Sequence, residues 1–170
     1  MKNNIAVFIA TLGVGKYLKM AATTTGIIYI PVVFFLLPIS RLIVWNPLFY
    51  MVIGLVVLAL GLWSIPIAER VLGPQVDPRG KVRDRDQNAI TIDELLGFMV
   101  TCVPFLFEVP QTLVNFAIAY FAFRFFDIIK KAAVGARYFD NMKSALGVML
   151  DDVVAGLWAG VVLYVLTLIL

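Results

Sequence analysis

The chain has 170 residues, of which 62% are hydrophobic, and its mean hydropathy of +0.95 is above that of soluble domains of ordinary composition. The net charge of +3 is modest, and we expect no nucleic-acid partner. The chain contains no histidine, which excludes histidine nucleophiles and imidazole metal ligands and leaves carboxylates as the main source of acid–base and metal chemistry. We therefore expect one integral membrane domain over residues 1–170, in which the single Cys102 forms no intrachain disulfide.

The first half of the chain predicts two membrane helices behind a short N-terminal segment. Ile5–Leu12 is apolar but too short to span, so we expect it to pack against the bundle or to lie at the membrane interface. Gly26–Trp45 and Leu48–Ile67 each approach the ~20 residues that a helix needs to cross ~30 Å of hydrocarbon. The Asn-Pro break between them predicts a helical hairpin. Glu69–Asn88, with its glycines, prolines and mixed charges, predicts a solvated loop.

A second, shorter hairpin is predicted next. Thr91 can cap a helix whose first turn holds Asp93 and Glu94, both favoured there by the helix dipole. The apolar body of this helix, Leu95–Phe107, rises only ~20 Å, so we expect it to be partly covered by protein or re-entrant. Thr112–Phe126 then returns the chain to the side from which the hairpin started.

A polar connection, Asp127–Leu150, leads to the last predicted helix. This helix is expected to start at Asp151 and Asp152 and to continue without charge through Val153–Leu170. The pattern as a whole predicts an all-α membrane bundle of about five apolar helices.

The distribution of basic residues predicts the orientation of this bundle. With both hairpins folded as above, thirteen Lys and Arg side chains fall on one face and only Arg41 falls on the other. We therefore expect a multi-pass protein of the inner (cytoplasmic) membrane, with its polar loops gathered on the cytoplasmic face. Ten of the eleven acidic residues lie on the same face, with Glu108 as the exception. A polar catalytic surface facing the cytoplasm would explain why they gather there.

Carboxylates and cations occur together where three predicted helices reach this face. For any one carboxylate alone, a structural role, as a first-turn residue favoured by the helix dipole or as a partner in a surface salt bridge, explains the residue as well as a functional role does. Adjacent carboxylate pairs on two separate helices repel each other unless a cation lies between them, and such oxygen-rich clusters suit Mg²⁺, Mn²⁺ or Ca²⁺. Arg124 and Lys130 nearby are suited to hold phosphate. Carboxylates, a divalent metal and fixed cations together predict phosphoryl transfer.

Three blocks of the sequence also carry a resemblance to a known family. Asp86–Gly97, Phe123–Lys130 and Gly147–Gly156 resemble the signature blocks of the phosphatidylglycerophosphatase A family, in the same order and at similar spacing. The resemblance implies an all-helical enzyme that uses Mg²⁺ to hydrolyse phosphatidylglycerophosphate, a phospholipid substrate in the membrane, to phosphatidylglycerol and phosphate.

The resemblance further implies which residues form the site. The expected metal ligands are the five acidic residues of the blocks: Asp93, Glu94, Asp127, Asp151 and Asp152. Catalysis is assigned to three of them: Glu94, Asp127 and Asp152. Binding of the substrate phosphate is assigned to Arg124, Lys130 and Thr23, the last being the residue kept from an N-terminal Pro-Gly-Thr-x-Gly-Ser pattern.

Departures from the family pattern leave alternatives open. The central block continues with Lys131, Ala132 and Ala133, where family members read Pro-Trp-Pro, so a related phosphorylated lipid is an alternative substrate. A non-enzymatic membrane protein that binds anionic lipid or a cation is a further alternative. The nucleophile, water or aspartate, and the oligomeric state are left open by the sequence.

Overall fold

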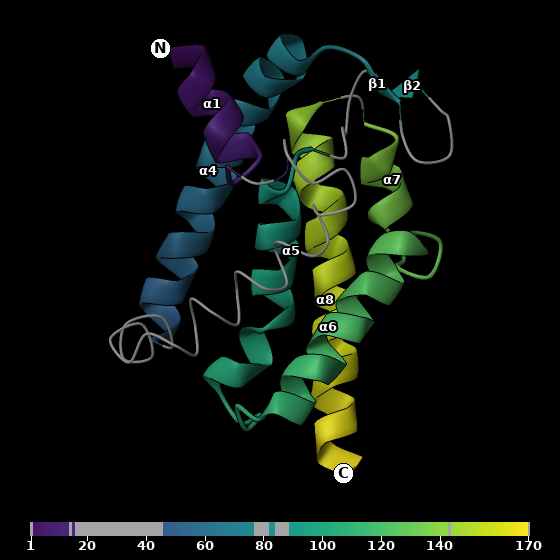
Figure 1. Ribbon diagram of the computed structural model, residues 1–170. Helices are drawn as coiled ribbons and strands as arrows, with labels where there is room; N and C mark the ends of the chain where they lie inside the picture. Colours follow the sequence, from purple (N-terminus) through teal and green to yellow (C-terminus); the bar gives the residue numbers. More distant parts are fainter. Residues whose placement is uncertain are drawn as a thin grey trace.

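A computed structural model of the protein describes residues 2–13, 15, 46–76, 82–83, 89–142 and 144–169. Within these ranges the regular secondary structure is helical apart from one short β-hairpin (Figure 1). The helices are α1 (Lys2–Ala10), α4 (Pro47–Leu72), α5 (Ile92–Thr101), the 3-10 helix η1 (Val103–Leu106), α6 (Leu113–Ile128), α7 (Ala136–Asp140) and α8 (Ala145–Ile169). The predicted membrane helix Gly26–Trp45 lies outside the described residues.

Helix α1 packs on α4, as predicted for the short N-terminal apolar segment. Ala6, Val7 and Ala10 are buried, and Val7 and Ala10 form a small apolar cluster with Ala68 and Leu72 of α4. With nine residues, α1 is too short to cross a bilayer.

Helix α4 begins at an Asn-Pro signal. The Asn46 side chain accepts hydrogen bonds from two backbone N–H groups of the first turn, at 3.1 and 3.2 Å, and Pro47 occupies the first helical position. Pro66 lies inside the helix, which ends only where Gly73 turns the chain with a φ of 67°. Glu69 is therefore helical, and the loop predicted to start there begins later in the chain.

The predicted solvated loop contains a small hairpin instead of being wholly irregular. Strand β1 (Gln75–Val76) pairs antiparallel with strand β2 (Val82–Arg83), and Val76 lies opposite Val82.

The second helical hairpin is short, as predicted. Thr91 is the N-cap residue of α5, but its side chain makes no cap hydrogen bond, so the predicted hydroxyl cap is wrong. The Thr112 hydroxyl does cap α6, because it accepts a hydrogen bond from the Asn115 N–H at 3.2 Å. Phe105 of η1 and Phe116 of α6 stack with their ring centroids 4.3 Å apart and close the hairpin.

Helix α8 begins at Ala145, so the prediction that the last helix starts at Asp151 is wrong. The Ser144 hydroxyl accepts a hydrogen bond from the Gly147 N–H at 3.2 Å, and the apolar residues that follow are largely buried against the neighbouring helices. These residues form the first turns of α8 instead of a polar connection. Asp151 and Asp152 consequently lie in the second turn, inside the helix, where the dipole at its start does not explain them.

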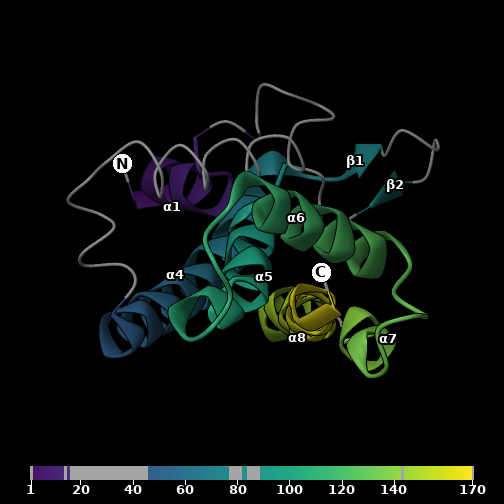
Figure 2. The ribbon, with the colours of Figure 1, turned by 90° about the horizontal axis from the view of Figure 1, so that it is seen from below.

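Helix α8 lies at the centre of the described fold. Helices α4, α5, α6 and α7 all contact it, and the view in Figure 2, close to the axis of α8, shows α5, α6 and α7 around it. Helices α5 and α8 both start in the upper half of Figure 1, and α6 runs toward this half from below. Among the described helices, α4 and α8 are long and apolar enough to cross a membrane.

Candidate active site

Two glycines allow α5 and α8 to approach until their backbones touch. A Cβ atom added at Gly97 would lie 2.6 Å from the carbonyl oxygen of Asp152, and one added at Gly156 would overlap the carbonyl oxygen of Gly97. Small residues permit such close packing of helices. Asp93, one turn before Gly97, is thereby placed near enough to Asp152 for their charges to interact.

An aromatic side chain of helix α6 packs against the contact between α5 and α8. The same Cβ atom at Gly97 would lie 2.8 Å from the ring of Phe123, which also packs edge-on against Phe98 of α5 at a centroid distance of 5.9 Å. Gly97 therefore lies where three helices meet. Arg124 follows Phe123 directly, so this packing also determines where the first cation of the site lies.

Four of the five predicted metal ligands converge from three helices. Asp93, Asp151 and Asp152 are 5, 3 and 3% exposed, although charged groups are rarely buried in this way without partners. Asp152 interacts electrostatically with Asp93, Asp127 and Asp151, which repel its charge, and with Lys130, which attracts it. The structure thus brings together acidic residues that are up to 59 positions apart (152 − 93) in the chain.

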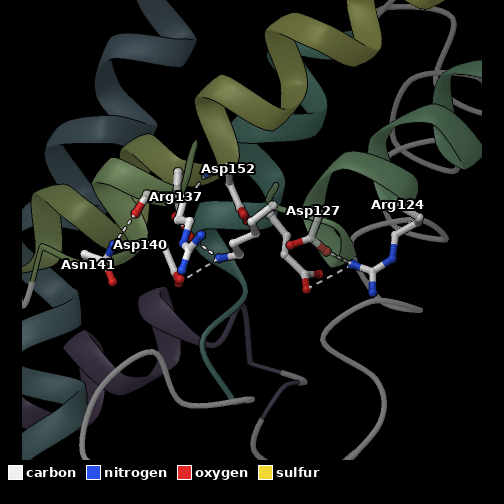
Figure 3. Close-up of polar contacts among 9 residues, drawn as sticks. Arg124, Asp127, Arg137, Asp140, Asn141 and Asp152 are labelled. Carbon is white, nitrogen blue, oxygen red and sulfur yellow. Dashed lines mark hydrogen bonds and ion pairs between the residues drawn. The ribbon is translucent and has the colours of Figure 1, made fainter. Parts of the chain in front are cut away.

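Arg124 links Glu94, the fifth predicted metal ligand, to Asp127 and so to the other four. Its Nη1 atom contacts Oδ2 of Asp127, one turn further along α6, and lies 3.5 Å from Oε1 of Glu94 on α5 (Figure 3). These side chains are only 15 to 16% exposed, so water screens the interactions less than at an open surface.

Lys130 reaches the carboxylates of α8 from the turn that follows α6. Its Nζ atom contacts Oδ2 of Asp151 and lies 3.4 Å from Oδ1 of Asp140 on α7. The other oxygen of Asp151, Oδ1, accepts a hydrogen bond from the Asp152 N–H at 3.0 Å. Sequence reasoning did not assign Asp140 to the site, because it falls outside the three blocks and only the packing of α7 on α8 brings it to Lys130.

The donor set fits a hard divalent cation such as Mg²⁺ in its chemistry, since it consists of carboxylate oxygens. Among the described residues, however, no three His, Cys, Asp or Glu side chains are already arranged to hold a metal ion. Asp127 and Asp151 contact Arg124 and Lys130 instead. A bound metal would take over carboxylates that these two cations neutralise in the structure.

Two further sequence predictions have different outcomes. Thr23, predicted to bind phosphate, lies outside the described residues. The alternative of first-turn residues and surface salt bridges holds in part. Asp93 and Glu94 lie in the first turn of α5, and Glu94, Asp127 and Asp151 do form ion pairs, but their side chains are only 4 to 16% exposed.

Buried carboxylates are faced by basic side chains in an apolar helical bundle, and two of its described helices are long and apolar enough to cross a membrane. This arrangement suits the class of helical enzymes that act on phosphate groups. The comparison with protein families agrees with this class. The family model described as Phosphatidylglycerophosphatase A matches residues 7–167, so the chain belongs to the phosphatidylglycerophosphatase A family and is a phosphatase.

Two curated proteins are similar to the chain, and the second of them carries the name of the family. A Bacteroides thetaiotaomicron protein named "Putative phosphatidylinositol-3-phosphatase" is 32% identical over 149 residues, which cover 85% of this chain and 79% of the relative. The "Phosphatidylglycerophosphatase A" of Haemophilus influenzae is 36% identical over 81 residues, which cover 46% of each chain. No solved structure matches the chain.

Proposed function

We propose that the protein is a Mg²⁺-dependent lipid phosphatase that hydrolyses phosphatidylglycerophosphate to phosphatidylglycerol and inorganic phosphate in phospholipid biosynthesis. Membership of the family supports the class of reaction. The substrate and the metal are what the proposal adds, together with the placement of the site at the cytoplasmic face.

The observation that carries the proposal is that acidic and basic side chains from three helices face each other. Asp93, Asp151 and Asp152 lie almost fully buried between α5 and α8. Lys130, in the turn after α6, contacts Asp151, and Arg124 of α6 pairs with Glu94 and Asp127. A phosphate monoester carries negative charge that the two cations can bind, Arg through a planar fork and Lys as a point charge. The carboxylates supply proton acceptors and metal ligands on the other side.

The reaction breaks the bond between phosphorus and the headgroup oxygen and forms a new bond from phosphorus to the oxygen of water. One proton leaves the attacking water, for which Glu94, Asp127 and Asp152 are the proposed acceptors, and one proton goes to the departing alcohol. A bound Mg²⁺ would supply Lewis acidity that activates water or polarises the phosphoryl oxygen. Asp93, Glu94, Asp127, Asp151 and Asp152 would hold it.

A route through an aspartyl-phosphate intermediate fits the same residues. Rapid quenching with radiolabelled lipid distinguishes the two: an acid-stable label on the protein indicates the aspartyl route, and direct attack by water leaves the protein unlabelled.

The membrane setting of the proposal is a multi-pass bundle of about five apolar helices. Its support is the pair of candidate spans α4 and α8 and the thirteen-to-one distribution of basic residues. Met1 is then cytoplasmic and Leu170 lies on the far side. Impermeant labelling of a cysteine added at each end tests this, and two ends that react from the same side would contradict the five-segment arrangement.

The activity itself is tested with purified, detergent-solubilised protein. Release of phosphate is measured from phosphatidylglycerophosphate, phosphatidylinositol 3-phosphate and phosphatidic acid, with Mg²⁺ and with a chelator. We expect Mg²⁺-dependent release that is fastest for phosphatidylglycerophosphate. Phosphate release that is unchanged by the chelator would contradict the proposed Mg²⁺ dependence. No release from any of the lipids would contradict the proposed phosphatase activity.

A second substrate is favoured by a separate observation. The chain aligns over 85% of its length with the relative named for phosphatidylinositol 3-phosphate, and it departs from the family pattern directly after Lys130, beside the proposed phosphate site. Both candidates are phosphate monoesters on a polyhydroxylated headgroup, so the same chemistry serves either. Faster hydrolysis of the inositol lipid in the panel would assign the protein to that substrate.

A further inference from the structure

A carboxylate outside the sequence motifs lies at the edge of the site. Oδ1 of Asp140 lies 3.4 Å from Nζ of Lys130, and the same ammonium contacts Asp151. The Asp140 side chain is 42% exposed and that of Asp151 only 4%. Lys130 therefore bridges a buried carboxylate, which belongs to the proposed metal ligands, and an exposed one, which does not.

Packing holds α7 in place independently of this ion pair. Ala133 and Ala136 are buried, α7 contacts α8, and the indole N–H of Trp158 donates a hydrogen bond to the carbonyl oxygen of Val134 at 3.2 Å. Gly135 turns the chain into α7 with a φ of 98°, a conformation that favours glycine. The backbone thus determines where Asp140 lies.

The Lys130 ammonium group is less closely tied to the backbone. It follows the C-terminal end of α6, its side chain is 24% exposed, and its ammonium group is carried on a flexible four-carbon stem. The position of this ammonium group depends on the carboxylates that attract it. The buried Asp151 attracts it inward, and the exposed Asp140 attracts it outward.

We propose that Asp140 is a positioning residue, which holds the Lys130 ammonium group at the exposed edge of the site so that it can receive the phosphate of the substrate. This inference rests on the proposed function, in which Lys130 binds that phosphate. Without the Asp140 carboxylate, the contact with Asp151 remains and draws the ammonium group toward the buried acidic residues, where their charges neutralise it. The phosphate then meets a weaker positive charge.

The test is Asp140→Asn in the full-length, detergent-solubilised protein. We expect the KM for the lipid that the parent hydrolyses, and the Kd for inorganic phosphate measured by calorimetry, to rise about three- to tenfold, while kcat changes less than about twofold. The melting temperature should not change, since an exposed ion pair contributes little to stability. Asp140→Glu, which keeps the charge, should restore most of the affinity.

Two further variants separate positioning from a structural role. Asn141→Ala removes a side chain that donates to the Arg137 carbonyl oxygen at the end of α7, and it should leave KM and phosphate binding unchanged. In a Lys130→Gln background, Asp140→Asn should have no further effect on KM or on the Kd for phosphate, because the residue through which it acts is gone.

Unchanged KM and phosphate Kd in Asp140→Asn would overturn the inference, and so would an equal effect of this change in the Lys130→Gln background. A parent protein that hydrolyses none of the lipids contradicts the proposed function instead. Phosphate binding by calorimetry still decides the role of Asp140 in that case, with a Kd that rises in Asp140→Asn supporting it and an unchanged Kd overturning it.

Discussion

The two sides of the site are built in different ways. On the side of α5 and α8, the backbones touch at Gly97 and Gly156, and the carboxylates between them are almost fully buried. On the side of α6 and α7, long basic side chains reach in and remain partly exposed. Helix packing fixes the carboxylates of the first side, whereas ion pairs hold the basic side chains of the second, so changes on the two sides should have different consequences for stability and catalysis.

The largest effect is expected from Asp152→Asn. The change removes one of several mutually repelling charges with little change of shape, so the metal-free variant should be at least as stable as the parent. Its activity should fall about a hundredfold or more, and Mg²⁺ should stabilise it less, because ligand stabilisation scales with affinity for the native state. Thermal melts with and without Mg²⁺, beside the phosphate assay, measure both.

A control for this change is Glu108→Gln, which removes the same charge from a residue between η1 and α6 and should leave activity unchanged. An Asp152→Asn protein that is destabilised yet active would indicate a structural role and would end the metal-ligand hypothesis at this position.

Gly97→Ala tests the contact between the helices without changing any charge. The new methyl group would lie 2.6 Å from the Asp152 carbonyl oxygen and 2.8 Å from the Phe123 ring, so α5 must move away from α8. Misplacement of reacting groups by ~1 Å can cost up to about a hundredfold in rate, and we expect a loss of a few tens of fold together with a lower melting temperature.

The matched control is Gly54→Ala on α4. The added methyl group there would meet only Leu96 Cδ1 at 3.9 Å, an ordinary contact. Equal activities of the two alanine variants would show that the approach of α5 to α8 does not govern the site.

Arg124→Lys tests the side of the cations. The charge is kept, but the planar fork that binds two phosphate oxygens is lost, so turnover should fall about tenfold with the fold preserved. Arg70→Lys is the control: the Arg70 Nε–H donates to the Pro66 carbonyl oxygen within α4, and this variant should retain normal turnover. Near-normal turnover in Arg124→Lys would assign Arg124 to a structural ion pair with Glu94 and Asp127.

The smallest effect is expected from Tyr164→Phe. The Tyr164 hydroxyl donates a hydrogen bond to Oε2 of Glu108 at 3.2 Å, and both side chains are exposed. Exposed polar contacts typically contribute ~1 kcal/mol or less, so stability should change by no more than this amount and activity by less than about twofold. A large loss of phosphate release would show that this end of the bundle also affects the site.

The sequence by itself determined the helical, apolar class and the residue types of the site. Apolar runs of fixed length, the lack of histidine and the three motif blocks identified Asp93, Asp127, Asp151 and Asp152 without any coordinates of the fold. These properties are readable because helix periodicity and hydrophobic length are local. The same local rules missed the start of α8, since the apolar turns before Asp151 resemble a loop until their burial is known.

Only the tertiary structure decided which of these residues meet. The contact of Gly97 with Asp152 depends on the packing of α5 on α8, and the contact of Lys130 with Asp140 depends on the packing of α7. Neither follows from sequence spacing, because a side chain's partners across helices are set by interhelical distance and rotation. Gly97 identifies a contact between helices only once the backbone of α8 is placed against it. Asp140, an exposed residue in a polar stretch, becomes part of the site only because Lys130 from another element reaches it.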